Sequence, residues 1–192
     1  IDMPLEGNAA HGLMDAFGVL LTRHYANYYC NVSYGILDLF GKQVGKDEIP
    51  VAAELLIEAG HVCAFNTFGG IMQSNEWNAM IKPMIEKKED WVHGITAVVN
   101  SLGWGFWEIQ DLSDTRLVMK IVSGYESNSY LRRYMETPSV PISFLATGGV
   151  AGLMNLIYVL NLPEISPVTL DERTYHLISS SKKIFKAKQL KC

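Results

Sequence analysis

The chain has 192 residues, of which 48% are hydrophobic, and its formal net charge is −4. This is enough for one globular domain with a buried core. The weak negative charge argues against nucleic-acid binding, because no basic stripe is available to neutralise phosphates. Three cysteines lie far apart without a Cys-x-x-Cys motif, which favours a reducing, cytoplasmic location. No basic-then-apolar leader is present, but the sequence begins at Ile1 rather than Met, so a removed leader stays an open alternative.

Apolar residues at three- and four-residue steps predict helices for most of the first half. After an irregular lead-in over residues 1–10, this pattern predicts helix from His11 to Phe40. Asp47-Glu48-Ile49-Pro50 then places acids and a proline where a helix begins. We expect that helix to run to about Phe65 and to end in a loop at Thr67-Phe68-Gly69-Gly70.

Two further helices are predicted before the middle of the chain. Ser74 is a suitable cap for a short helix through Ile81. A longer apolar pattern predicts a helix from Trp91 to Leu102, stopped at Gly103.

The stretch Leu102 to Gly124 predicts a β-hairpin. Apolar runs at Phe106–Ile109 and Leu117–Val122 are rich in aromatic and β-branched residues and flank a short polar turn. In the second run alternate residues face opposite ways. One of these faces is fully apolar and the other nearly so, so we expect both sides of the hairpin to be covered.

The segment Ile142 to Leu162 carries no charge over 21 residues, which is long enough to cross a bilayer. However, it contains polar residues and lacks flanking Lys or Arg anchors. We therefore predict a buried helix from about Phe144 to Leu160 and no membrane span. Gly148 and Gly152 share one helical face, which would let a neighbouring backbone come close.

The remaining C-terminal part divides into two segments. Val168 to Ile178 fits either a strand or a helix, and Ser181 to Cys192 alternates as a terminal strand. Residues 1–192 are therefore expected to form one α/β (α+β) domain, in which helices pack around a small, twisted, mostly antiparallel sheet. Residues 1–102 would form its helical part, and residues 103–192 the hairpin, buried helix and terminal strand.

A set of short segments follows one another in a recognisable order. They are Leu102-Gly103-Trp104-Gly105, the hairpin, Ser123-Gly124-Tyr125-Glu126-Ser127, Phe144 to Gly152, and Phe185 to Cys192. In this order they resemble the 4-vinyl reductase (hydrocarbon-binding) domain family. The resemblance implies a fold similar to the TRAPP trafficking subunits, often dimeric, with a small-molecule pocket between helix and sheet. It also implies roles such as sensing aromatic compounds or assisting bacteriochlorophyll synthesis.

The C-terminus departs from that family's pattern. Family members commonly end with Glu-x-x-Cys followed by Gly-Asp and a second Cys, which hold zinc in some sensors. Here Gln189 stands where the Glu would be, and the sequence ends at Cys192, which matches the first Cys. Because a neutral amide is a poor zinc ligand, we expect no metal at this place and regard Cys192 as a weak candidate ligand.

Aromatic and sulfur-containing side chains are concentrated around the hairpin and the buried helix. A cavity for a small apolar or aromatic molecule would need such a lining, although the same residues could simply fill a dense core. The candidate ligand-binding residues are Trp104, Phe106, Trp107, Met119, Phe144, Met154, Tyr158 and Phe185.

Two acid–histidine pairs with i, i+3 spacing are candidates for catalysis. Glu58 with His61, and Asp90 with His93, match the Glu-x-x-His spacing of di-iron helical bundles, but the first predicted helix offers only Asp15 as a further ligand. A single metal held by His61, Cys63, His93 or His176 is an alternative. Glu58, His61 or His93 could instead perform acid–base catalysis without a metal.

Three functions follow from these observations. The first is a ligand-binding or sensing module that forms a homodimer. The second is an enzyme that uses the same pocket. The third is a structural assembly partner, which requires a filled core and an exposed apolar patch beyond the dimer contact. The sequence indicates neither the ligand nor a cofactor.

Overall fold

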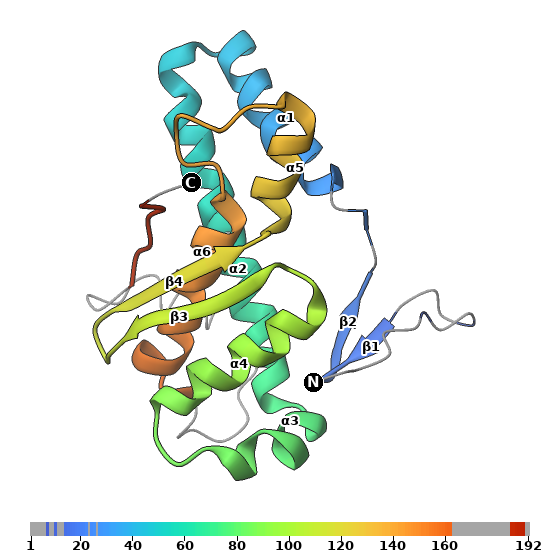
Figure 1. Ribbon diagram of the computed structural model, residues 1–192, viewed down its shortest axis with the longest axis vertical. Helices are drawn as coiled ribbons and strands as arrows, with labels where there is room; N and C mark the ends of the chain where they lie inside the picture. The colour runs from blue at the N-terminus through green and yellow to red at the C-terminus, as the bar shows by residue number, and fades with distance from the viewer. Residues whose placement is uncertain are drawn as a thin grey trace.

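The computed structural model describes residues 7, 10, 14–22, 24–25, 27–162 and 185–190. These residues form the predicted α+β fold, in which helices pack against a small antiparallel sheet, β3–β4 (Figure 1). A second two-stranded antiparallel sheet, β1–β2, lies near the N-terminus. The elements in chain order are β1 (Met14–Ala16), β2 (Val19–Leu21), α1 (Asn27–Gln43), η1 (Lys46–Glu48), α2 (Ile49–Gln73), α3 (Asn75–Met80), η2 (Lys82–Met84), α4 (Glu89–Leu102), β3 (Phe106–Leu112), β4 (Leu117–Val122), α5 (Tyr125–Tyr134), α6 (Phe144–Met154) and the π-helical turn η3 (Asn155–Val159).

Helices α2 and α6 cross at the centre of the fold with their backbones in contact. A Cβ atom built on Gly148 would lie 1.9 Å from the carbonyl oxygen of Ile57, and one on Gly60 would lie 2.2 Å from that of Leu145. No side chain fits at either place, so glycine is required on both helices. The close approach expected at Gly148 is confirmed, and Gly60 is its counterpart on the other helix.

The hairpin of β3 and β4 is confirmed, with a register that runs from Phe106↔Val122 to Leu112↔Leu117. Its inner face packs on the large hydrophobic core through Trp107 and through half-buried side chains of β4. The outer face is open, since Phe106 is 56% exposed and Val122 is also exposed. The expected cover on both sides is therefore wrong.

Two apolar clusters stabilise the described part of the chain. The larger lies between α2, α3, α4 and α6, and it includes fully buried Phe65, Trp77 and Ile95. The smaller lies between α1, α2 and α6 and includes Cys30 and Phe144. Residues from both halves of the sequence contribute to each cluster.

The N-terminal prediction of helix from His11 onward is wrong over β1 and β2. Phe17 and Gly18 both have positive φ angles, 49° and 68°, at the tip of a two-residue hairpin turn. Such a turn matches the twist of antiparallel strands. The helix begins only at Asn27.

Helix α2 begins as predicted, with Pro50 in its first turn, but it ends later than predicted. It continues through the segment Thr67 to Gly70, for which a loop was expected, and ends at Gln73. Phe68 and Gly69 are buried there, so tertiary packing outweighs the low helix propensity of two consecutive glycines.

The predicted helix ends around α3 and α4 are confirmed. The backbone N–H of Trp77 donates to Ser74 Oγ at 3.0 Å, which caps α3. Gly103 ends α4 in the left-handed conformation, with φ 81°. The uncharged segment after Phe144 is also the predicted buried helix, continued by the π-helical turn.

The C-terminal prediction is tested only over residues 185–190. Side chains alternate there between half-buried and exposed, as the predicted strand requires, but these residues form no strand. Hydrogen bonds to the side chains of Asn155 and Gln189 hold this segment instead of strand pairing. The ambiguous segment Val168 to Ile178 lies outside the described residues.

One helical stretch of the described residues meets the length and composition expected of a membrane span. It runs from Lys46 to Gln73, and half of its most apolar 18-residue window is buried inside the protein. Core helices often meet the same criterion. The apolar helix Phe144–Val159 is shorter.

Candidate functional site

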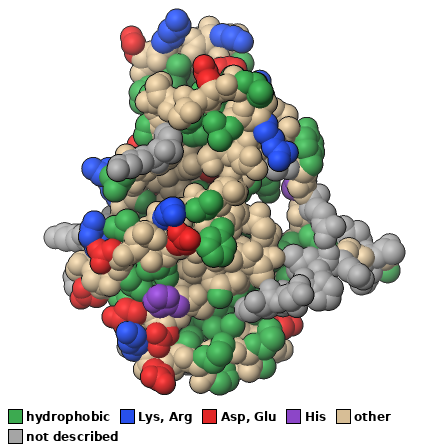
Figure 2. All heavy atoms as spheres, viewed as in Figure 1, with side chains coloured by type: hydrophobic (Ala, Val, Ile, Leu, Met, Phe, Trp, Pro, Cys, Tyr) green, Lys and Arg blue, Asp and Glu red, His purple; other side chains and the backbone are tan. Residues whose placement is uncertain are grey.

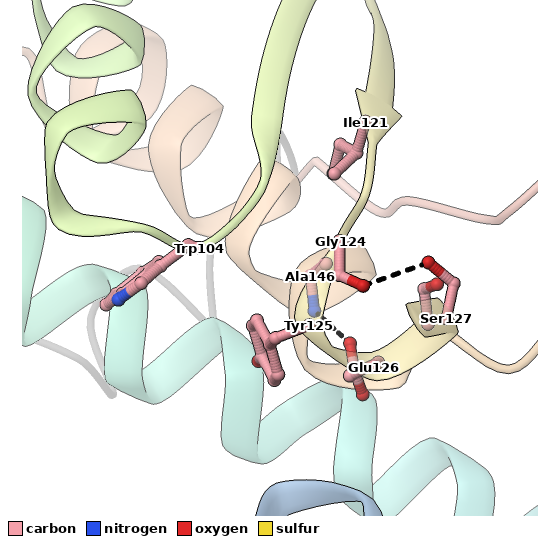
Figure 3. Close-up of a pocket in the computed structure, with 8 residues that line it drawn as sticks. Trp104, Ile121, Gly124, Tyr125, Glu126, Ser127 and Ala146 are labelled. Atoms are coloured by element: carbon pink, nitrogen blue, oxygen red, sulfur yellow. Dashed lines mark hydrogen bonds between the residues drawn. The ribbon is translucent and has the colours of Figure 1, made fainter. Parts of the chain in front are cut away.

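The N-terminus of α6 is built around a buried carboxylate. Glu126 lies in the first turn of α5, shortly after β4, and is only 2% exposed. Its Oε1 accepts a hydrogen bond from the backbone N–H of Leu145 at 3.0 Å. Its Oε2 accepts one from the backbone N–H of Ala146, also at 3.0 Å (Figure 3). These N–H groups have no partner within the helix, and a negative charge is favoured at this end of the helix dipole.

A second side chain completes this cap from the other end of the chain. Gln189 Oε1 accepts hydrogen bonds from the backbone N–H groups of Ile142 and Ser143, both at 2.9 Å. Two side chains that are distant in sequence therefore bind two N–H groups just before α6 and two in its first turn. Gln189 thus has a structural role.

Burial raises the pKa of the Glu126 carboxyl to about 7, while the backbone N–H groups that bind it act in the opposite direction. Burial also raises the pKa of the neighbouring Tyr125 hydroxyl, and the charge of Glu126 adds to that rise. The carboxyl therefore changes its charge near neutral pH, in surroundings that disfavour further negative charges.

A small cavity of about 20 Å³ adjoins Glu126. It is lined by Trp104, Ile121, Gly124, Tyr125, Glu126, Ser127, Ser143 and Ala146 (Figure 3). This volume holds about one water molecule, so it has no room for an organic ligand. The geometry suits a structural carboxylate better than a catalytic one.

A larger, open groove lies between η2 and α4. It encloses about 290 Å³ and is lined by Ile81, Met84, Ile85, Asp90, His93, Gly94 and Ala97. Asp90 accepts hydrogen bonds from the backbone N–H groups of Glu86 and Lys87 at 2.9 and 3.0 Å. These two bonds lower the pKa of Asp90, so its carboxylate already holds the backbone of the loop that leads into α4.

The predicted ligand-binding residues occupy different surroundings. Trp107 and Met154 are buried in the large core, and Trp104, Met119, Tyr158 and Phe185 pack against it. Phe144 belongs to the smaller cluster, whereas Phe106 is exposed. Trp104 lines the small cavity beside Glu126, and none of the eight lines the open groove.

The hairpin and α6 meet at this point of the core. A Cβ atom on Gly149 would lie 3.6 Å from the ring of Trp107, which is ordinary van der Waals contact. The indole of Trp107 therefore packs directly on the face of α6.

The catalytic candidates belong to two separate environments. His61 is buried on α2, where its Nδ1 lies 3.8 Å from Glu58 Oε2. His93 is exposed on α4 and lines the open groove. Among the described residues, no group of three or more His, Cys, Asp or Glu side chains could hold a metal ion.

The other proposed metal ligands are scattered or lie outside the described residues. Asp15 lies in β1 rather than in a helix, and Cys63 is exposed on α2. His176 and Cys192 are not among the described residues.

Asn155 is one of the polar residues in the uncharged segment Ile142 to Leu162. It is fully buried in the π-helical turn. Its amide binds the backbone of Phe185 through both of its ends and also approaches His61. The signal that could have found it is its place in an otherwise apolar helix, because a buried amide requires partners.

No family model matches the chain, and no curated protein is found to be similar to it. The resemblance to the 4-vinyl reductase domain family therefore stays a prediction.

Proposed function

We propose that the protein is an assembly module that pairs with a second copy of itself through the outer face of α1. The supporting observation is the distribution of side chains around this helix. Cys30, Ser33 and Tyr34 are buried against the rest of the domain. A second apolar stripe is exposed on another face, at Tyr28 (44%), Val32 (41%) and Leu39 (56%).

A third face of α1 is polar and carries Asn31, Asp38 and Lys42, which are exposed. A surface helix of a monomer needs one apolar face and one polar face. The additional stripe on α1 is therefore surplus to folding. Exposed apolar residues that gather in this way mark interaction surfaces.

The exposed apolar surface extends beyond α1. Helices α1 and α5 lie side by side at one end of the molecule, and Leu131 and Met135 are exposed at the end of α5 (Figure 1). Hydrophobic side chains also reach the surface at this end in the space-filling view (Figure 2). This gives the proposed interface more area than one helix face could supply.

A second copy is the partner that the charges favour. In a twofold dimer the same patch meets itself, so the patch must be complementary to its own copy. The polar face beside the stripe carries one acid and one base, Asp38 and Lys42. It can therefore pair with an identical surface, whereas a surface of a single sign would repel its own copy.

Glutamate substitutions within the stripe test this proposal. Val32→Glu and Leu39→Glu place a charge at a contact that must lose water, so each variant should elute as a monomer in size-exclusion chromatography. Met80→Glu is the matched control, since Met80 is exposed to the same degree as Tyr28 but lies on α3, at the opposite end of the molecule (Figure 1). It should elute with the wild type. If all three variants eluted together, the proposal would fail.

Binding of a small apolar or aromatic molecule is the second candidate, and the open groove between η2 and α4 favours it. Its volume of about 290 Å³ is close to the lower limit of ligand sites, about 300 Å³. Apolar side chains line it, and His93 and Asp90 supply polar groups. This groove differs from the pocket between helix and sheet that the family resemblance implies.

Filling the groove tests this second candidate. Ala97 is exposed in the groove, so Ala97→Phe should abolish binding of aromatic fluorescent probes without unfolding the domain. Ala59→Phe is the matched control, because Ala59 is an exposed helical alanine that does not line the groove. Equal probe binding by the two variants would remove the groove as a site. The enzymatic alternative predicts in addition that any activity is lost in His93→Ala or His61→Ala.

A further inference from the structure

The C-terminal segment, residues 185–190, is held to the domain by an amide clamp. The backbone N–H of Phe185 donates to Asn155 Oδ1 at 2.7 Å, and Asn155 Nδ2 donates to the carbonyl oxygen of Phe185 at 3.1 Å. Only the amide oxygen can accept the N–H of Phe185. These two bonds therefore fix which end of the Asn155 amide is oxygen and which is nitrogen.

This orientation determines the protonation state of His61. Asn155 Nδ2 also lies 2.9 Å from His61 Nε2. Because Nδ2 is a donor, His61 Nε2 must accept with its lone pair, and the ring proton must be on Nδ1. The ring is therefore neutral in the clamped state, and its Nδ1 points towards Glu58 at 3.8 Å.

Protonation of His61 would set two donors against each other at Nε2. The amide of Asn155 could avoid this conflict by turning over, but its nitrogen would then face the N–H of Phe185. The clamp cannot satisfy a protonated His61 and the backbone of Phe185 together. The same segment carries Gln189, which caps α6 through Ile142 and Ser143.

The charged surroundings of His61 are simple among the described residues. Glu58, on the same helix, faces the ring. Helix α6 and the π-helical turn present Gly152 and Asn155, which carry no charge. On the C-terminal segment the charged residues are Lys186 and Lys188, both exposed.

We propose that residues 185–190 form a proton-controlled latch, which neutral His61 holds closed through Asn155 and which protonation of His61 releases. The released state frees the backbone of Phe185 and removes Gln189 from the start of α6. The domain thereby couples the pH of its surroundings to the position of its C-terminal segment.

The direction of the pH dependence follows from burial. Desolvation lowers the pKa of His61 from its ordinary value of 6.5, and Glu58 acts in the opposite direction. The clamped state therefore binds the proton less readily than the released state. The clamped state is therefore fully favoured above about pH 6.5. Below that value the equilibrium constant for clamping falls by up to about tenfold per pH unit.

The protein contains an internal control for this measurement. Asn100 clamps Trp107 in the same way, with the N–H of Trp107 donating to Oδ1 at 2.7 Å and Nδ2 donating to the carbonyl oxygen at 3.1 Å. No bond between Asn100 and a histidine is seen among the described residues. Hydrogen exchange at Phe185 and at Trp107 therefore compares two matched clamps in one sample.

The experiment is amide hydrogen exchange of the full chain between about pH 5 and about pH 7.5, corrected for intrinsic rates. Protection of Phe185 should fall at least fivefold relative to Trp107 towards acidic pH. In His61→Gln the side-chain oxygen can still accept a hydrogen bond from Asn155 but cannot be protonated. The ratio of the protection at Phe185 to that at Trp107 should therefore not change with pH in this variant. A constant ratio in the wild type, or an unchanged fall in His61→Gln, would overturn the proposal.

A second variant keeps the test independent of how well His61→Gln folds. Asn155→Asp replaces the donor at His61 Nε2 by a carboxylate oxygen, which favours the protonated ring. The pKa of His61, followed by NMR of the imidazole, should rise above about 6.5 in this variant. An unchanged or lower pKa would contradict the geometry from which the latch is inferred.

Discussion

Replacing Glu126 by glutamine should make the stability of the domain less dependent on pH. In the folded state the carboxyl is buried and its pKa is raised from 4.5 to about 7. Folding therefore favours the protonated form. The contribution of this group to the free energy of unfolding is fully present below about pH 4.5 and is lost as the pH rises through about 7.

The magnitude follows from the size of this rise. A difference from 4.5 to about 7 corresponds to about 3 kcal/mol, since each pH unit is worth about 1.4 kcal/mol. Glu126→Gln removes the loss of stability that the wild type suffers as the pH rises. It also leaves the backbone N–H of Leu145 or of Ala146 facing the amide nitrogen, which costs about 1–3 kcal/mol at every pH. The variant should be about 1–3 kcal/mol less stable than the wild type in acid. Above neutral pH it should be equally stable or up to about 2 kcal/mol more stable.

Urea denaturation at a series of pH values measures this effect. The free energy of unfolding of the wild type minus that of Glu126→Gln should fall by about 3 kcal/mol between about pH 4.5 and about pH 7.5. Titration of His61 occurs in both proteins and cancels in the difference. Glu136→Gln is the control, because Glu136 is exposed just after α5, and its difference should be flat. A difference for Glu126→Gln that is flat or grows with pH would refute the reasoning.

Two further predictions concern the helices. Gly148→Ala should destabilise the domain by more than about 3 kcal/mol, because a Cβ atom there meets the carbonyl oxygen of Ile57. Gly35→Ala is the control: a Cβ atom there meets open space inside α1, so this variant should be about 0.5–1 kcal/mol more stable than the wild type. Thermal unfolding measures both variants, and equal melting temperatures would contradict the close approach of α2 and α6. Ser74→Ala should cost about 1 kcal/mol through loss of the cap on Trp77, measured by urea denaturation, and an unchanged midpoint would show that the cap contributes nothing.

Features set by a few neighbouring residues could be predicted from the sequence. The hairpin of β3 and β4, the cap at Ser74 and the helix end at Gly103 depend on local turn and capping chemistry. Gly148 could also be predicted as a place of close approach. Its partner Gly60 could not be predicted, because the helix that comes close to it lies more than eighty residues later in the sequence.

The remaining features depend on contacts that one sequence does not reveal. The length of α2 was underestimated, since burial of Phe68 and Gly69 overrides their local preference for a loop. Glu126 lies in the first turn of α5, yet its partners are the N–H groups of another helix, α6. Gln189 and Asn155 likewise acquire their roles through long-range hydrogen bonds.

The mass of the wild-type protein in solution tests the proposed assembly most directly. Native mass spectrometry at micromolar concentration should give twice the chain mass of 21.4 kDa, and Leu39→Glu should give the chain mass alone. A wild type that stays at the single-chain mass at every concentration would contradict a self-complementary surface on α1.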